Sequence, residues 1–398
     1  MKKKVLIFSL NYRPFIGGAE VALEEITTRL QGTYEFHVVT LRYDSNLPKE
    51  EDLGGVEVHR IGFGGKGMTA AKSFHPLFYL SKILFVPLAA YCGWKLHRKH
   101  EFSVFWAMMA YMVFPITLLR LVGTRVPYMI TLQEGDPFEH VFSRPLIIPF
   151  RPLLSYGFSR AGALQAISEY LLVWGEKLGF KGKGVVIPNG VDSALFSTPI
   201  IEEERSRIRS RYAADDETLL VTTSRLVHKN GIDTVIEALP ELPKVKFLVI
   251  GEGPDKEKLE GLSRKLGVAE RVIFLGSKPY RELPQYLQSS DIFIRPSRSE
   301  GMGNSFIEAM AAGIPVIATQ EGGIKDFLFD AKRNPEREAT GFAVTKESPT
   351  EIVEAVGRVL GNKEDTKRVV ENARTLVQET YDWERVSTSM RALFSTLS

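Results

Sequence analysis

Short runs of β-forming residues alternate with segments of helical spacing along the chain, and this alternation restricts the fold more than any other feature. The run Val5–Leu10 is followed by apolar residues at helical spacing between Ala19 and Leu30, and then by the run Phe36–Leu41. Such a rhythm is typical of parallel βαβ units. Further strands of the same sheet are expected at Val56–Ile61, Ser103–Ala107, Tyr128–Leu132, Ala163–Ile167 and Val185–Ile187.

A second alternating series starts after a boundary of turn-forming and charged residues. Turn formers occupy Ile187–Asp192, and a highly charged run follows from Glu202 to Arg211. Strands are expected beyond this boundary at Leu219–Thr223, Phe247–Gly251, Val272–Leu275, Ile292–Pro296, Val316–Ala318 and Phe342–Val344. The two series together predict an α/β protein with two doubly wound parallel sheets.

The length of the chain supports two domains, because 398 residues exceed the usual size of one hydrophobic core. We expect a first domain at residues 1–195, a second domain at 196–375 and a final helix at 376–398 that packs back on the first domain. Trp383 and Leu393 would anchor this helix. A cleft between two such domains is a common position for a ligand.

Composition restricts the partners and the compartment. Lys and Arg outnumber Asp and Glu by only 51 to 48, a balance that does not favour nucleic acid as the main partner. The single cysteine, Cys92, permits no intrachain disulfide and suits the reducing cytoplasm. The first residues resemble a signal peptide, but the apolar run stops at Asn11, so a buried strand is expected there. The apolar stretch Val104–Leu119 contains Pro115 and is too short to predict a transmembrane helix.

The segment Pro296–Glu308 has the clearest chemical pattern, because it follows a predicted strand and opens a predicted helix. The carboxyl edge of a parallel sheet is where such folds bind ligands. Gly301 and Gly303 allow close approach of the backbone, and the amides that begin the helix favour a phosphate oxygen. A diphosphate fits this position.

Two carboxylates flank the expected diphosphate. Glu300 on the loop and Glu308 in the helix could accept hydrogen bonds from hydroxyl groups, one from a sugar and one from a ribose. That combination describes a nucleotide sugar. Ser305 and Glu308 also match a capping box, in which Glu308 only satisfies the start of the helix. The segment alone leaves both interpretations open.

Two other loops are candidates for phosphate binding. Arg225 and Lys229 follow the first strand of the second domain and could neutralise a departing diphosphate. A solvated loop is the alternative. In the first domain, Gly17 and Gly18 join the first strand to the first helix and could direct backbone amides at the phosphates. A tight connector would explain these glycines as well.

In combination, these features resemble the retaining glycosyltransferase family 4, whose members have the GT-B fold of two Rossmann-like domains that face each other across a cleft. The resemblance rests on Gly17-Gly18, Ile187–Asp192, Arg225 with Lys229, and the Glu-x7-Glu spacing of Glu300 and Glu308. It covers essentially the whole chain and is most specific from Ser299 to Ala318.

The resemblance implies a role for each matching residue. Glu300 would hold hydroxyls of the donor sugar, Glu308 those of the ribose, and Arg225 with Lys229 the phosphates. Further donor contacts would come from Gly18, Gly301, Met302, Gly303, Asn304 and Ser305. Transfer would retain the anomeric configuration, and the leaving diphosphate would take the proton of the acceptor. No Asp-x-Asp pair lies in a suitable loop and the histidines are scattered, so neither a metal nor another cofactor is expected.

The chain departs from the family at two positions. Gln133 stands where many relatives have a histidine, and a glutamine can bind a sugar but cannot take a proton. Gln133 and the nearby Asp136 are the candidates for the acceptor side. The phosphate lysine of the family would align with Asn230, whereas Lys229 precedes that position by one residue.

The family points to transfer of a hexose from a nucleotide diphosphate sugar to a glycan or a lipid-linked acceptor, in cell-surface polysaccharide or glycolipid biosynthesis. Two alternatives stay open. One is a nucleotide-sugar 2-epimerase of the same fold, and the other is a non-catalytic subunit that binds a nucleotide sugar.

Residues 72–100 combine large apolar side chains with basic ones and could rest on the anionic inner face of a membrane. The basic side chains are Lys72, Lys82, Lys95, His97, Arg98, Lys99 and His100. Burial against the sheet would explain the apolar part from Phe74 onward equally well.

Overall fold

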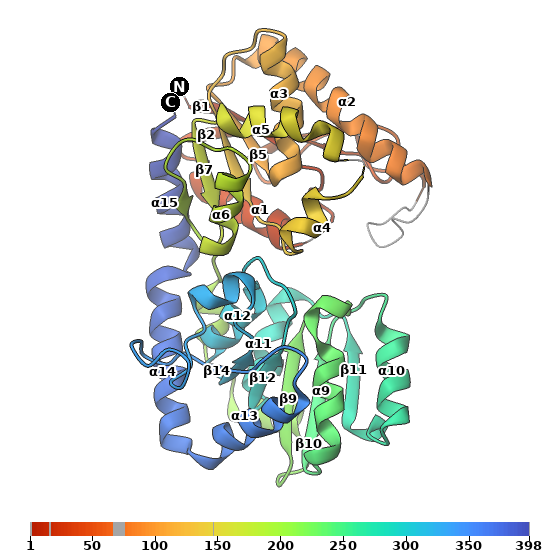
Figure 1. Cartoon of the computed structure of the whole chain (residues 1–398), viewed down its shortest axis with the longest axis vertical. Coiled ribbons are helices and arrows are strands. Elements are labelled where there is room, and N and C mark those ends of the chain that lie inside the picture. The colour runs from red at the N-terminus through yellow and green to blue at the C-terminus, as the bar shows by residue number, and fades with distance from the viewer. Residues whose placement is uncertain (1, 16, 67–75, 146, 398) are drawn as a thin grey trace. The chain divides into compact units, whose positions relative to one another are not determined.

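The computed structural model describes residues 2–15, 17–66, 76–145 and 147–397, and it forms two compact units. Unit 1 comprises Met1–Asn189 together with Trp383–Ser398, and unit 2 comprises Gly190–Asp382. In Figure 1, unit 1 takes the colours from red to yellow-green and also the dark blue of the last helix, α15. The chain therefore leaves unit 1, builds unit 2 and returns to unit 1.

Unit 1 is built on an eight-stranded sheet with the order β3-β4-β2-β1-β5-β6-β7-β8. Its strands are β1 (Lys3–Phe8), β2 (Tyr34–Leu41), β3 (Glu50–Asp52), β4 (Val56–Ile61), β5 (Val104–Met108), β6 (Tyr128–Leu132), β7 (Ala163–Ala166) and β8 (Val185–Val186). All neighbouring strands pair in parallel except β3 and β4. The strand order reverses at β1, so the carboxyl ends of β1 and β5 mark the place where such sheets bind ligands.

Strand β3 is absent from the sequence-based expectation. It consists of Glu50, Glu51 and Asp52, which lack the apolar side chains on which strand prediction depends, and it forms by antiparallel pairing with β4. The other strands of both sheets begin and end within two residues of the predicted positions.

Helices cover both faces of this sheet, because successive residues of a strand point to opposite sides. Val5 and Ile7 share a core cluster with residues of α1 and α15, whereas Phe8 approaches Gly93 of α2 on the other face. The helices of unit 1 are α1 (Gly18–Leu30), α2 (Pro76–His100), α3 (Val113–Leu121), α4 (Phe138–Phe142), α5 (Arg151–Ser159), α6 (Glu169–Lys177) and α15 (Trp383–Ser395). None of the helices in the described ranges combines the length and the apolar character needed to cross a bilayer.

The last helix, α15, completes the core of unit 1. Phe394 is fully buried, with its ring 5.3 Å from Tyr34 and 5.2 Å from Trp106. Arg29 of α1 donates a hydrogen bond to Glu384 of α15 at 2.8 Å. The final residues of the chain are therefore part of the first fold unit.

Unit 2 is built on a six-stranded parallel sheet with the order β11-β10-β9-β12-β13-β14. Its strands are β9 (Thr218–Thr223), β10 (Val245–Ile250), β11 (Val272–Gly276), β12 (Ile292–Arg295), β13 (Val316–Ala318) and β14 (Phe342–Ala343). The order reverses at β9, which lies between β10 and β12. The loops after β9 and β12 are therefore neighbours at the edge where ligands bind.

Helices pack around this second sheet and close a separate apolar core around Phe247 and Val249. They are α7 (Ser193–Ser197), α8 (Glu202–Arg209), α9 (Ile232–Ala238), α10 (Lys256–Lys265), α11 (Leu283–Gln288), α12 (Asn304–Ala312), α13 (Pro349–Gly361) and α14 (Lys363–Thr380). The two sheets confirm the predicted fold class of two Rossmann-like doubly wound domains.

Candidate active site

The loop between β12 and α12 ends in a turn that only glycine adopts without strain. Gly303 precedes α12 with a φ of +93°, in the left-handed region that side chains disfavour. A Cβ atom on Gly303 would lie 2.9 Å from Nη2 of Arg295 and 2.6 Å from the ring of Phe306. The turn aims the start of α12 at the sheet edge, and the first backbone N–H groups of a helix have no carbonyl partner within it.

Glu300 is buried beside an arginine that sequence reasoning did not single out. Its Oε1 accepts hydrogen bonds from Nη2 of Arg295 at 2.9 Å and from Oγ of Ser297 at 3.2 Å. Both bonds go to the same oxygen. Among the described residues, none hydrogen-bonds to the other oxygen, Oε2.

Arg295, the last residue of β12, is only 5% exposed. Its guanidinium also donates to the carbonyl oxygen of Thr223 at 3.2 Å and to Oγ of Ser305 at 2.6 Å, and it lies 4.1 Å from the ring centre of Phe306. Burial lowers the pKa of Arg295, and the charge of Glu300 acts in the opposite direction. The sequence signal was an arginine that closes an otherwise apolar buried strand.

Glu308 lies on α12 with a partly exposed side chain, close enough to Arg295 for their charges to interact. Burial raises the pKa of Glu308 to about 7, and the charge of Arg295 opposes this shift. The capping-box interpretation is wrong, because Gly303 is the N-cap residue and Ser305 already lies inside the helix. Ser305 instead accepts the hydrogen bond from Arg295.

The loop after β9 is held against the loop after β12. The backbone N–H of Arg298 donates to the carbonyl oxygen of Lys229 at 2.6 Å. Gly231 has a φ of +70°, and a Cβ atom there would lie 2.2 Å from the carbonyl oxygen of Pro296. The side chain of Arg225 is exposed on this loop. Burial is the main cause of the lowered pKa of Arg295, and the positive charge of Arg225 lowers this pKa further.

Asn230 stabilises the same loop by a hydrogen bond of its buried side chain. Its side chain is buried, and Nδ2 donates to the carbonyl oxygen of Arg225 at 2.7 Å. The position that aligns with the lysine of the family therefore holds the loop together. Positive charge in this loop comes from Arg225 and from the partly exposed Lys229.

The loop after β13 is hydrogen-bonded to the backbone of the loop that carries Glu300. The backbone N–H of Gly323 donates to the carbonyl oxygen of Glu300 at 3.1 Å, and Oγ1 of Thr319 donates to the carbonyl oxygen of Ser297 at 2.6 Å. Gly301 and Met302 are buried in this packed segment, whereas Gly303, Asn304 and Ser305 are partly exposed.

The predicted acceptor-side residues and Gly18 belong to unit 1. Gly18 is the exposed first residue of α1, after β1, and Gln133 and Asp136 follow β6 and are partly exposed. Oε1 of Gln133 accepts a hydrogen bond from Nδ2 of Asn189 at 3.2 Å. All three predicted residues therefore follow the carboxyl ends of strands in the first sheet.

Glu134, which sequence reasoning also missed, lies between these residues. It is buried, and its carboxyl group accepts hydrogen bonds from the backbone N–H of Ala110 at 2.7 Å and of Gln133 at 3.0 Å. Burial raises the pKa of Glu134 to about 6, although these hydrogen bonds oppose the shift. Glu134 thus fixes the backbone that presents Gln133.

The structure brings Arg225, Lys229, Glu300 and Glu308 to one edge of the sheet of unit 2. Two family models match the chain: residues 204–376 match the glycosyl transferases group 1, and residues 16–195 match Glycosyltransferase Family 4. The chain belongs to glycosyltransferase family 4. The family predicted from the motifs is thereby confirmed.

Relatives of this glycosyltransferase come from bacteria, archaea and plants. A GDP-mannose-dependent alpha-(1-6)-phosphatidylinositol monomannoside mannosyltransferase of Mycolicibacterium smegmatis is 32% identical over 220 residues, which cover 52% of this chain and 55% of that protein. The aligned part thus spans about half of that relative. An uncharacterized glycosyltransferase of Methanocaldococcus jannaschii is 24% identical over 396 residues, 99% of both chains.

Solved structures resemble the whole glycosyltransferase chain. Sucrose-phosphate synthase from Thermosynechococcus elongatus superposes with a TM-score of 0.81 at 19% identity, covering 100% of this chain and 99% of that one. Anabaena HepE in complex with UDP and glucose superposes with a TM-score of 0.76 at 20% identity, covering 99% of both chains. These similarities confirm the GT-B fold.

Proposed function

We propose that this glycosyltransferase moves a hexose from a nucleotide diphosphate sugar to a glycan or lipid-linked acceptor, with retention of the anomeric configuration and without a metal ion. The observation that supports this most is the Glu300 carboxylate, which Arg295 and Ser297 hold by one oxygen beside the start of α12. A carboxylate with a spare oxygen suits a sugar hydroxyl, and the start of a helix suits a phosphate.

The donor would be held by four side chains of unit 2, those of Arg225, Lys229, Glu300 and Glu308. The diphosphate would accept hydrogen bonds from the backbone at Gly303 to Ser305 and would face the cationic groups of Arg225 and Lys229. Oε2 of Glu300 would accept a hydroxyl of the sugar, and Glu308 would bind the ribose.

In the transfer step, the acceptor hydroxyl oxygen forms a bond to the anomeric carbon on the face from which the diphosphate departs. The bond between the anomeric carbon and the phosphate oxygen breaks, and the departing oxygen takes the acceptor proton. Arg225 and Lys229 stabilise the charge that develops on the leaving group. Gln133 would bind the acceptor by hydrogen bonds. It would not need to act as a base, because the departing diphosphate takes the acceptor proton.

A lipid-linked acceptor would be collected by α2. This helix buries Phe85, Ala89 and Leu96, yet it also exposes a row of apolar residues. The exposed row consists of Leu80, Ile83, Leu88, Tyr91 and Trp94, and the exposed basic residues Lys95, Arg98 and Lys99 follow it. Such a face suits an anionic membrane surface. Residues 72–75 of the predicted surface segment, which include Lys72 and Phe74, lie outside the described residues. One relative is named as a transferase to phosphatidylinositol monomannoside, which is consistent with this acceptor class.

The membrane part of the proposal is tested by flotation with anionic vesicles at low salt. We expect the chain to float and Tyr91→Ser with Trp94→Ser to remain at the bottom, because the substitutions remove exposed apolar contacts. Wild-type protein that stays wholly at the bottom contradicts this part.

The central test uses UDP-, GDP- and ADP-linked hexoses in a thermal-shift screen, followed by product analysis in the presence of EDTA. Binding of one donor class, release of its nucleoside diphosphate and an α-to-α or β-to-β product would support the proposal. An isomerised donor would indicate an epimerase, and binding without any reaction would indicate a non-catalytic subunit. Loss of turnover on chelation with an unchanged melting temperature would contradict the metal-free mechanism.

A further inference from the structure

Three ionisable side chains gather at the amino-terminal part of the sheet of unit 1. Glu35 and His37 stand two residues apart on β2, so both emerge on the same face of the sheet. His100 is the last residue of α2, which packs on β2 and β4. The substrate residues assigned to unit 1 follow the carboxyl ends of strands, so this cluster is separate from them.

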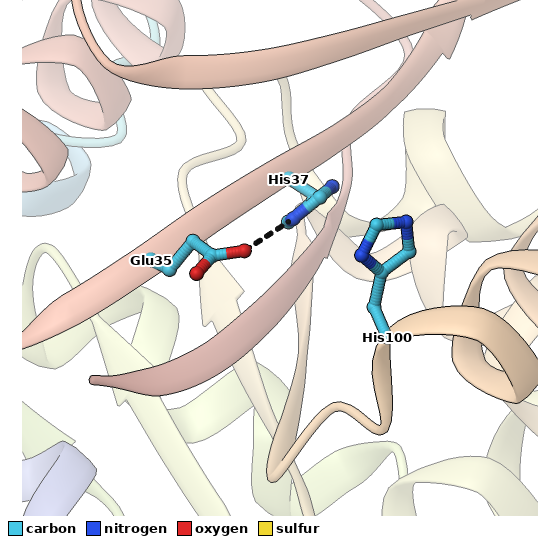
Figure 2. A group of neighbouring side chains, drawn as sticks. All are labelled: Glu35, His37 and His100. Carbon is cyan, nitrogen blue, oxygen red and sulfur yellow. Dashed lines mark hydrogen bonds and ion pairs between the residues drawn. The ribbon is translucent and has the colours of Figure 1, made fainter. Parts of the chain in front are cut away.

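His37 is the centre of the cluster and is only 2% exposed. Its Nε2 lies 3.1 Å from Oε1 of Glu35, and its Nδ1 lies 3.1 Å from Nε2 of His59. The ring of His100 is centred 4.7 Å from that of His37. Figure 2 shows Glu35 reaching one ring nitrogen of His37, with the His100 ring close by at the end of α2.

We propose that Glu35, His37 and His100 bind one divalent transition metal ion, for which Zn²⁺ is the best match. One ligand atom from each residue lies within 4.8 Å of those of the other two. Two imidazoles and a carboxylate are typical zinc ligands, and the ligand atoms of a tetrahedral zinc site stand about 3.3 Å apart. The distance of 3.1 Å between Glu35 and His37 already fits.

The third ligand can complete the site without a change in the fold. His100 ends its helix and is partly exposed, so rotation of its side chain can close the remaining distance. The side chain of Glu35 is 40% exposed, which gives the ion a path from solvent. Lys4, whose Nζ lies 3.7 Å from Oε1 of Glu35, is the cation that the metal would displace. A water molecule would fill the fourth position.

His59 and Glu50 follow Nδ1 of His37 in an arrangement that supports metal binding at its other nitrogen, Nε2. A histidine that binds metal through one nitrogen donates its other N–H to a neighbouring acceptor. Nδ1 of His37 faces Nε2 of His59, and Nδ1 of His59 lies 3.6 Å from Oε1 of Glu50. In the described part of the chain, Nδ1 of His59 is buried without a hydrogen bond. With a metal ion at Nε2 of His37, its Nδ1–H would donate to Nε2 of His59, and Nδ1–H of His59 would then point toward Oε1 of Glu50.

A hydrogen-bonded polar cluster without metal would not account for His100. Within the described residues, its ring packs against the rings of His37 and Phe102 but makes no hydrogen bond. A metal ion explains why three side chains able to bind metal converge there, and it would tie the end of α2 to β2. The ion would therefore stabilise unit 1 and have no part in the transfer step.

The test uses the tag-free full-length chain, stripped with a chelator and titrated with ZnCl₂ against a chromophoric zinc indicator. We expect one equivalent of Zn²⁺ to bind and the melting temperature to rise by about 5 °C or more at a hundredfold excess over Kd. Co²⁺ bound in place of Zn²⁺ should give the visible absorption of a tetrahedral ion.

Two variants and one control decide the assignment. His100→Gln and Glu35→Gln, both at accessible positions, should weaken Zn²⁺ binding at least about tenfold and remove the Co²⁺ absorption. His140→Gln, at an exposed position of α4, should bind like the wild type. Absence of saturable binding in the wild type overturns the proposal, as does unchanged affinity in both site variants.

Discussion

Arg295 and Glu300 depend on each other at the scale of single residues. Both are buried, and the guanidinium of Arg295 is held by Glu300, Ser305 and the carbonyl oxygen of Thr223. A buried charge that loses its partner is strongly destabilising. A substitution at Glu300 is therefore expected to act on stability as well as on catalysis.

Glu300→Gln should reduce kcat on the order of 100-fold or more, because a charged contact to the donor sugar is lost. It should also lower the free energy of unfolding by about 2 kcal/mol, since the amide leaves the charge of Arg295 uncompensated. Affinity for the nucleoside diphosphate should change little. Steady-state kinetics, urea unfolding and isothermal titration measure the three quantities.

The matched control is Glu347→Gln, which removes an exposed partner of Arg298 from the same unit. We expect it to change both activity and stability only slightly, as exposed ion pairs contribute little. Wild-type turnover in Glu300→Gln would refute the assignment of this residue to the donor sugar.

Glu308 predicts a pH dependence of stability. Its folded-state pKa is raised by burial to about 7 from an ordinary 4.5, so the folded chain holds more protons than the unfolded chain between these values. The free energy of unfolding must then fall as pH rises through this window. Glu308→Gln should remove the effect and gain about 2 kcal/mol over wild type at pH 8, but little at pH 5.

Denaturant titrations at both pH values test this expectation, with Glu354→Gln on the exposed side of α13 as control. The same difference between variant and wild type at pH 5 and pH 8 would mean that Glu308 is not shifted in this way.

At the scale of elements, two tight backbone contacts and one turn order the loops of the candidate site. Gly231 lies against the carbonyl oxygen of Pro296, Gly322 against that of Glu300, and Gly303 turns the chain into α12. All three have positive φ angles, of +70°, +60° and +93° respectively. The loops after β9, β12 and β13 therefore form one packed surface.

Gly303→Ala should strain this surface, because an alanine in the left-handed region costs about 1–2 kcal/mol and its Cβ meets Arg295. We expect the melting temperature to fall and donor affinity to drop together. Gly261→Ala is the matched control, since Gly261 lies within α10 with nothing near its Cβ position. That variant should gain about 0.5–1 kcal/mol. A wild-type donor affinity in Gly303→Ala would show that this turn does not position the phosphate site.

Elements were predictable from the sequence where a single local signal dominates. Apolar runs locate the strands, and the glycines locate the turn before α12. Strand β3 escaped prediction because its three charged residues are ordered only by pairing with β4. Arg295 escaped because its role depends on Glu300, Ser305 and Thr223, which meet only when β9, β12 and α12 pack.

At the scale of the whole molecule, the chain order differs from the order of the fold units. Residues of unit 2 separate α15 from the rest of unit 1, whose core includes Trp383 and Phe394. The cluster of Glu35, His37 and His100 has the same character, since His100 is far in sequence from Glu35 and His37 and meets them through the packing of α2 on β2. Scattered histidines therefore predicted no such site.

Phe394→Ala should destabilise unit 1 by about 4 kcal/mol, because it empties a fully buried aromatic position. Hydrogen exchange followed by mass spectrometry should show faster exchange in β1, β2 and α1, with unit 2 unaffected. Leu360→Ala, at a position of α13 that is 45% exposed, should cost about 0.5 kcal/mol or less. Uniform loss of protection across both units would show that they do not unfold separately.

The anchoring of Glu300 by a single oxygen has a stereochemical consequence. A carboxyl group that is pinned in this way cannot swivel to follow a hydroxyl group that points elsewhere. Two donors that are epimers at the carbon facing Glu300 would then differ in whether their hydroxyl group meets Oε2 at all. Selection between epimers would come from the fixed orientation of one side chain.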